Sequence, residues 1–263
     1  MERDLRSGTV TAEIVPAELT GRGEETELAT RPNDELALGA VDGEAGAGLL
    51  RPAFLSVVYG TSKAVQRGFP VGGWALGTDT LVGKLGDVLK ITILQASTFF
   101  REYLGSDAWK AGIQAQSFKT RKEVEKAGGT LVWDNSRVPA VPPTYSEAIA
   151  LKVLIEKPKD LVSMDFGIDI DGKQYALARI IFDKTAAASV LPNYITAKDL
   201  NLRPPKRIYH GVFDLATTFR QKGKSEPKLA VGMRLSGLHT PTTIQVIEDL
   251  FGRVKFDEEI PLT

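Results

Sequence analysis

The sequence predicts a mostly β fold: a small antiparallel barrel with insertions and a few short helices, lying between disordered acidic ends. About six segments alternate apolar and polar residues with the period of two that is typical of strands. Glycine-rich turns separate these segments, and few stretches have a helical period. The chain has 263 residues and 43% hydrophobic content, which is enough to bury a sizeable core.

Two strands are expected in the first part of the body. The earlier one covers residues 54–59, and a helical turn at 63–67 follows it and ends at Gly68. A stretch punctuated by glycines, 72–86, leads to the longest β pattern, 88–95, which extends to residue 103. Within this pattern, Leu89, Ile91 and Ile93 are expected to share one face, which leaves Lys90, Thr92 and Leu94 on the other.

Residues 105–147 interrupt the β pattern as a long excursion. Thr120 and Glu123 have the spacing of a capping box and predict a short helix over 120–127. Three prolines in the second half of the excursion exclude a central strand there.

The β pattern resumes after the excursion. Further strands are expected at 148–155, 164–170, 175–182, 212–220 and 228–236. The dipeptide Asp171-Gly172 is a strong hairpin signal between the second and third of these. In the last hairpin, the alternation leaves Arg220, Lys228 and Arg234 on the face opposite the apolar residues. Residues 184–200 are expected to be helical but broken at Pro192, and 241–250 to form a helix capped by Thr240.

Charge divides the chain into three regions. Residues 1–50 hold 11 acidic and 4 basic residues, a net of −7, and have the composition of a disordered leader. Residues 248–263 hold 5 acidic and 2 basic residues, a net of −3. The body between them, 51–247, holds 27 basic and 17 acidic residues, a net of +10. A basic body between acidic ends is the electrostatic pattern of a protein that binds a polyanion, although a solvated surface also explains it.

The composition leaves most enzyme chemistries without their residues. There are no cysteines and only two histidines, His210 and His239, so thiolate zinc sites and cysteine nucleophiles are excluded. No phosphate-binding loop is present, and Asp165, Asp169 and Asp171 lack the order of an EF-hand. A hydrolase that uses these aspartates is an alternative class. We expect no enzymatic activity, no cofactor and no metal.

The N-terminus lacks the basic and then apolar pattern of a signal peptide, and no apolar run is long enough to span a bilayer. The sequence therefore predicts a cytoplasmic protein without a membrane partner.

Aromatic and basic residues lie next to one another along the body. Single-strand binding uses this combination, because rings stack on unpaired bases while cations replace the counterions of the phosphates. The predicted contacts with nucleic acid are Trp74, Lys90, Phe99, Arg101, Tyr103, Trp109, Arg207, Tyr209, Arg220, Lys222, Lys224 and Lys228. A barrel that serves this purpose is expected to be OB-like.

The C-terminal tip has the composition of a partner-binding segment. Its three carboxylates keep it solvated, and its proline forbids a helix between two apolar anchors, Ile260 and Leu262. The predicted partner-binding residues are Phe256, Asp257, Glu258, Glu259, Ile260, Pro261 and Leu262. The tip resembles that of bacterial single-stranded-DNA-binding proteins, but it has Leu262 in place of an aromatic residue and Thr263 beyond it. An ordinary frayed terminus is the alternative.

The body also resembles a known group. Residues 52–63, followed by Gly72-Gly73-Trp74 and the β pattern from Val88, are similar to tailed-phage replication proteins regarded as single-stranded-DNA-binding. The resemblance covers roughly residues 50–240 and includes a late hairpin like Phe213 to Leu235. The chain departs from the group because it lacks the cysteines of some members, and its residues 184–200 are less basic.

Body and tip together predict a viral single-stranded-DNA-binding protein of the host cytoplasm. It would coat unpaired DNA without sequence specificity and recruit replication or recombination proteins through its tip. The sequence is also compatible with a homo-oligomer. The alternative from another class is a viral structural or assembly protein whose β-rich body makes protein contacts. Its distinguishing feature would be an extended apolar face without a connected basic groove.

Overall fold

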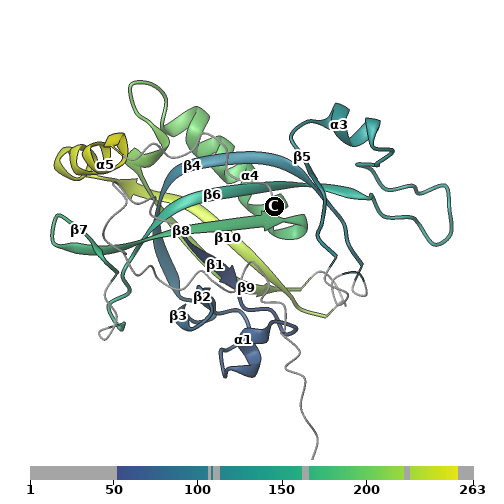
Figure 1. Ribbon diagram of the computed structural model, residues 1–263, viewed down its shortest axis with the longest axis horizontal. Helices are drawn as coiled ribbons and strands as arrows, with labels where there is room; N and C mark the ends of the chain where they lie inside the picture. Colours follow the sequence, from purple (N-terminus) through teal and green to yellow (C-terminus); the bar gives the residue numbers. More distant parts are fainter. Residues whose placement is uncertain (1–51, 106–107, 109–112, 162–165, 222–225, 254–263) are drawn as a thin grey trace, which may run out of the picture. The chain divides into compact units, whose positions relative to one another are not determined.

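A computed structural model describes residues 52–105, 108, 113–161, 166–221 and 226–253 (Figure 1). All of them belong to one compact unit, Asp34–Thr263. The fold is mostly β, and its ten strands form one curled, open sheet. Along the sheet, the strand order is β10-β9-β4-β6-β8-β1-β2-β3, with β5 added to β4 and β7 added to β8.

The strands are β1 (Ala53–Val57), β2 (Trp74–Leu76), β3 (Thr80–Gly83), β4 (Val88–Glu102), β5 (Ser117–Phe118), β6 (Tyr145–Glu156), β7 (Ile168–Ile170), β8 (Lys173–Asp183), β9 (Gly211–Arg220) and β10 (Lys228–Leu238). The helices are α1 (Lys63–Gln66), α3 (Arg121–Lys126), α4 (Lys184–Thr196), the π-helical η1 (Ala197–Asn201), the 3-10 helix η2 (Ile208–His210) and α5 (Pro241–Arg253). Every strand pair is antiparallel except β1 with β8, which is parallel.

Strand β4 joins the two halves of the sheet. Its first four residues, Val88 to Ile91, pair with β9, and its residues from Ile91 onward pair with β6. A register shift between Ile93 and Gln95 in the pairing with β6 marks a β-bulge. The side chains of Lys90 and Thr92 therefore share a face with those of Gln95, Ser97 and Phe99, because the extra residue at the bulge shifts the alternation by one position.

The concave face of the curled sheet carries the main core. Leu55, Trp74, Ile93, Leu151 and Phe213 are fully buried in it, and they come from five different strands. Helix α4 packs into the same core through Ala187, Val190 and Tyr194. We call the opposite side of the strands the outer face. At one end of it, Ile247 of α5 packs on Leu154, Ile170 and Tyr175.

Several local predictions are confirmed. The capping box of α3 forms as expected, with the Glu123 amide donating to Thr120 Oγ1 at 3.3 Å and the Thr120 amide donating to Glu123 Oε2 at 2.9 Å. The turn at Asp171-Gly172 has the positive φ angles of a hairpin turn, 56° and 74°. Thr240 caps α5 by accepting from the Thr243 amide at 3.1 Å.

Two local predictions are wrong. Pro192 does not break α4, which continues through it to Thr196, because Pro192 and its neighbour Asn193 lie on the exposed side of a helix that its buried residues hold against the core. Helix α5 also extends to Arg253, past the expected start of the tail at residue 248.

Within the described ranges, no helix is long and apolar enough to cross a membrane.

Candidate nucleic-acid interface

A row of polar side chains crosses three strands of the outer face. Gln95 of β4 lies opposite Lys152 of β6, and Lys152 lies opposite Arg179 of β8. Directly opposed residues present their side chains on the same face of a sheet, so the two cations are neighbours. Phe54 of β1 continues the row beyond Arg179. We refer to Gln95, Lys152 and Arg179 as the basic row.

The basic row concentrates positive charge at the sheet surface. Lys152 is only 8% exposed although it is a lysine, and Arg179 is half-buried. Burial, together with the nearby charge of Arg101, lowers the pKa of Arg179. Each member of the row takes part in a polar or electrostatic interaction. Like charges this close create a positive potential that favours an anionic partner.

One exposed aromatic ring lies beside the basic row, and two others lie near Asp183 and Lys184, at the end of β8. Phe54, Tyr59 and Tyr103 are 39%, 45% and 46% exposed, and the first of these lies directly beside Arg179. Tyr59 follows the end of β1, where burial and the charge of Asp183 raise the pKa of its hydroxyl. These rings can offer stacking surfaces beside the cations.

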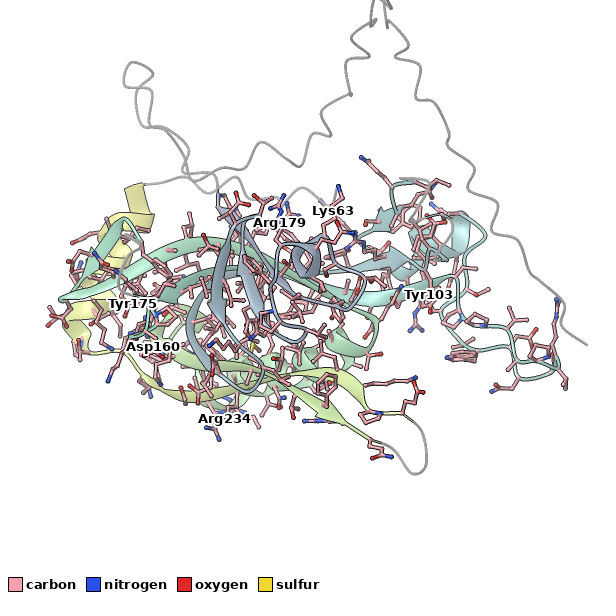
Figure 2. All side chains as sticks on the ribbon, turned by 90° about the horizontal axis from the view of Figure 1, so that it is seen from below. Lys63, Tyr103, Asp160, Tyr175, Arg179 and Arg234 are labelled. Carbon is pink, nitrogen blue, oxygen red and sulfur yellow. The ribbon has the colours of Figure 1, made fainter. Side chains whose placement is uncertain are left out.

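Arg101 and Tyr103 are held in place at the end of β4. Arg101 Nη1 lies 3.5 Å from Asp183 Oδ2, and the ammonium of Lys184 lies 3.9 Å from the centroid of the Tyr103 ring. Lys184 has a φ angle of 50°, which is uncommon for a residue with a side chain. Figure 2 shows Arg179 and Lys63 on one side of the described chain and Arg234 on the opposite side.

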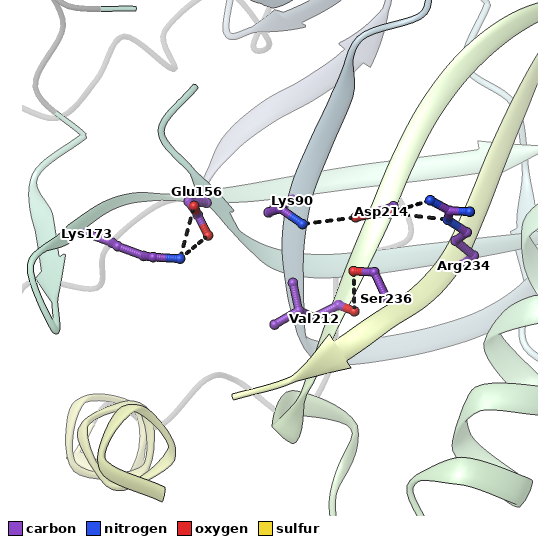
Figure 3. A network of polar contacts seen from close by, with 7 residues as sticks. All are labelled: Lys90, Glu156, Lys173, Val212, Asp214, Arg234 and Ser236. Atoms are coloured by element: carbon purple, nitrogen blue, oxygen red, sulfur yellow. Dashed lines mark hydrogen bonds and ion pairs between the residues drawn. The ribbon is translucent and has the colours of Figure 1, made fainter. Parts of the chain in front are cut away.

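A second row crosses the outer face where β4 meets the last hairpin. Lys90 lies opposite Asp214, and Asp214 lies opposite Arg234. The Lys90 ammonium is 3.4 Å from Asp214 Oδ1, and Arg234 donates to Asp214 Oδ2 from Nε at 3.2 Å and from Nη2 at 3.0 Å (Figure 3). We refer to these three residues as the neutralised row.

Asp214 is the centre of the neutralised row and is buried. Burial alone would raise its pKa, but hydrogen bonds from Ser236 and Arg234 and the charge of Lys90 together lower the pKa below its ordinary value. The charge of Lys90, which we predicted to meet a phosphate, is therefore partly compensated within the fold.

The tip of the last hairpin carries the other predicted cations on the outer face. Arg220 and Lys228 lie directly opposite each other at the ends of β9 and β10, and both are exposed. This confirms the prediction that they share the face of Arg234. Lys222 and Lys224, between them in sequence, lie outside the described residues, as does Trp109.

Two of the predicted rings are buried in the structure. Trp74 is completely buried in the main core, so the prediction that it stacks on bases is wrong. Phe99 belongs to the outer face but is only 3% exposed, because it packs with Ala148, Ala150 and Ile181. Its ring is therefore not presented to a ligand either. The residues that cover each ring come from distant parts of the chain, so the sequence did not reveal them.

Arg207 and Tyr209 lie around η2, apart from both rows in sequence. The Tyr209 hydroxyl donates to Glu248 Oε1 at 2.8 Å. The rings of Tyr209 and His210 pack edge to face, with their centroids 4.8 Å apart. Burial and this carboxylate raise the pKa of Tyr209. Tyr209 thus connects η2 to α5, whereas Arg207 is exposed and lines a cleft.

The site residues predicted from the sequence did not include Lys152, Arg179 or Lys184. Lys152 and Arg179 stand within otherwise apolar strands, and a lone cation in such a run was the available signal. Their proximity depends on the register between β6 and β8, which the sequence does not specify.

The predicted partner-binding tip lies wholly outside the described residues, which end at Arg253. The role assigned to it therefore stays a prediction for each of its members, namely Phe256, Asp257, Glu258, Glu259, Ile260, Pro261 and Leu262.

Across the described part of the chain, no group of three or more His, Asp or Glu side chains is arranged to hold a metal ion. Of the three aspartates named in the sequence, Asp165 lies outside the described residues, and Asp171 Oδ2 accepts from the Thr243 hydroxyl at 3.2 Å.

The chain matches no known family model, no curated protein and no solved structure.

Proposed function

We propose that this protein binds single-stranded DNA without sequence specificity through the outer face around the basic row. The observation that carries the proposal is the placement of Lys152 beside Arg179 on the outer face, with the exposed ring of Phe54 next to Arg179. Cations attract the phosphates of any sequence, and rings stack on any base. In this proposal the protein acts without enzymatic chemistry, cofactor or metal, and the DNA strand crosses the curled sheet as it crosses an OB-fold.

The setting proposed for this activity is replication or recombination of a bacteriophage in the host cytoplasm. The acidic tip would recruit other replication proteins, because its carboxylates stay solvated while Ile260 and Leu262 enter a pocket on the partner. Replacing Ile260 and Leu262 with alanine in the full chain should abolish capture of those proteins and leave DNA affinity unchanged. Weaker DNA binding by this variant would contradict a separate role for the tip.

A fluorescence titration at two salt concentrations tests the DNA-binding proposal. Labelled oligo-dT should bind with an affinity that falls steeply with salt, and duplex DNA should bind much more weakly, because its bases are not free to stack. A titration with an RNA oligonucleotide of the same length measures the preference for DNA over RNA. Equal affinity for duplex and single strand, or no binding at low salt, would contradict the proposal.

An assembly role is the second candidate, and a projecting arm favours it. The arm consists of residues 130–144 and projects from the sheet (Figure 1). At its base the Thr130 amide donates to Thr144 Oγ1 at 2.7 Å. The arm exposes Val132 (75%), Trp133 (58%) and Val138 (99%) to solvent. Exposed apolar groups of this kind mark surfaces for protein contacts.

Sedimentation of the full chain tests the assembly role. The assembly role is supported if the protein self-associates and if its oligomers dissociate when Val132 and Val138 are replaced with serine. If the protein is a monomer at all concentrations and the variant sediments in the same way, self-assembly through the arm is contradicted.

A further inference from the structure

A cleft on the side of η1 and η2 is lined by an unusual concentration of cations. Its volume is about 480 Å³, and it lies between the end of α4 and the segment that leads into β9. The charged residues that line it are Lys198, Arg203, Lys206 and Arg207, together with the single carboxylate Asp199. The lining therefore has a net charge of +3, from four cations and one carboxylate.

Local hydrogen bonds set the positions of these cations. Arg203 Nε donates to the Asp199 carbonyl, which ties the guanidinium to the last turn of η1. The Lys206 amide donates to the Arg203 carbonyl at 2.9 Å, so a tight turn places Lys206 beside Arg203. The His210 amide donates to the Arg207 carbonyl at 2.9 Å and begins η2 immediately after the rim. Four cations thus lie on two short, hydrogen-bonded segments.

The fold does not compensate these charges. In the described ranges, none of the four cations makes an ion pair, whereas Lys90, Arg101 and Arg234 all do. All four side chains are exposed at the rim. Exposed cations without a carboxylate partner contribute little to folding, so their concentration around one cleft points to an external anion.

The floor of the cleft is apolar. Tyr194 and Leu202 are buried members of the core, and Ile208 packs against it. The flat, weakly polar face of a nucleobase can pack on such a floor. Inorganic phosphate cannot, because it is charged and hydrated. The volume is within the range of sites that take small molecules.

We propose that this cleft binds a phosphorylated nucleotide, with the base on the Tyr194, Leu202 and Ile208 floor and the phosphate among the rim cations. The nucleotide is either free or the terminal residue of a DNA strand. The inference does not rest on the proposed function, because the cleft and the basic row use different residues.

Calorimetric titration of the full chain with dTMP, thymidine and inorganic phosphate tests this inference. The nucleotide should bind more tightly than either of its parts, because only it uses both floor and rim. The double variant Lys206→Ala/Arg207→Ala should weaken dTMP binding about tenfold, since charge-assisted hydrogen bonds are lost. The variant Lys126→Ala/Lys159→Ala makes the same charge change at exposed sites outside the cleft and should leave dTMP binding unchanged.

Two further measurements are needed. One distinguishes a free nucleotide from the end of a DNA strand, and the other distinguishes this inference from the proposed function. If a strand end is the ligand, a 5′-phosphorylated oligo-dT should bind more tightly than its unphosphorylated form, and this difference should vanish in the cleft variant. If a free nucleotide is the ligand, dTMP binds but the 5′ phosphate makes no difference. Arg179→Gln should leave dTMP binding unchanged even if it abolishes strand binding. Thymidine or phosphate binding as tightly as dTMP, or equal losses in both double variants, would overturn the inference.

Discussion

Two rows of side chains on the outer face have similar compositions but different electrostatics. The basic row places Lys152 and Arg179 next to each other, with the uncharged Gln95 at its end. The neutralised row also has two cations, but Asp214 lies between Lys90 and Arg234 and bonds to both. The neutralised row thus has a carboxylate at its centre that bonds to both of its cations, whereas the centre of the basic row is itself a cation, Lys152.

This difference explains why the net charge of +10 in the body is a poor guide to the site. Charge that a fold pairs internally adds little to the potential at the surface, whereas neighbouring like charges reinforce each other. Lys90, which the sequence made a strong candidate, belongs to the first kind. Arg179, which the sequence did not single out, belongs to the second.

The largest effect is expected from removing charge in the basic row. Arg179→Gln should weaken oligo-dT binding about tenfold and reduce the slope of log affinity against log salt by about 1. Gln95→Glu should weaken binding similarly, because it gives the basic row a carboxylate like that of Asp214. Arg234→Gln removes the same amount of charge from the neutralised row and serves as the control. Equal losses in all three variants would show that only overall charge matters.

A somewhat smaller effect is expected from removing a ring. Tyr103→Ala should weaken oligo-dT binding about fivefold, because it removes a surface on which one base stacks. Phe219→Ala is the matched control, since Phe219 is 47% exposed at the end of β9, away from the basic row. Both variants should be measured by the same titration. A larger loss in the Phe219 variant would move the bound strand to the hairpin.

Asp214→Asn should leave Lys90 and Arg234 without the carboxylate that lies between them. The substitution should lower the free energy of unfolding at pH 7 by about 0.5–1 kcal/mol, because the asparagine keeps an acceptor but loses the charge. It should also strengthen oligo-dT binding about twofold, as a new cationic row becomes effective.

The pH dependence of the Asp214 effect has a definite sign. The folded protein lowers the pKa of Asp214, so the contribution of this group to stability is full above its ordinary pKa of 3.8 and is lost as the pH falls through the lowered value. Urea unfolding at pH 7 and pH 3 should therefore show a smaller difference between variant and parent at pH 3. A difference that does not change with pH would contradict the charge argument.

The smallest effect concerns His239, which lies beside the neutralised row. Its Nε2 is 2.6 Å from the Thr92 hydroxyl oxygen, and burial followed by the charge of Lys173 lowers its pKa. Below pH 6.5 the unfolded chain takes up a proton that the folded chain resists, so stability falls as the pH is lowered. The fall in melting temperature between pH 7.5 and 5.5 should be smaller in His239→Asn than in the parent.

Local signals in the sequence were sufficient for many elements of the fold. The Thr120 capping box, the Asp171-Gly172 turn and the last hairpin all occur where their residues indicate. Each of these depends on residues close in sequence, and this is why short motifs predict them. The parallel pairing of β1 with β8 depends on residues more than a hundred positions apart and was not predicted.

The candidate site was predicted less well than the fold, for the same reason. Arg101 and Tyr103 were identified from adjacent rings and cations, but the position of Arg101 near Arg179 follows from the register of β4, β6 and β8. Trp74 was misassigned because a strand of three residues, all buried, has no alternation to read. The cleft cations were missed, apart from Arg207, because the curled sheet and α4 create the cleft.

Photochemical cross-linking of bromouracil-substituted oligo-dT to the full chain, followed by mass spectrometry, tests the central claim most directly. Base stacking beside the basic row predicts adducts on Tyr103, Tyr59 or Phe54, lost on competition with unlabelled oligo-dT and absent in Arg179→Gln. Adducts confined to the hairpin at Phe219, or an unchanged pattern in Arg179→Gln, would contradict it.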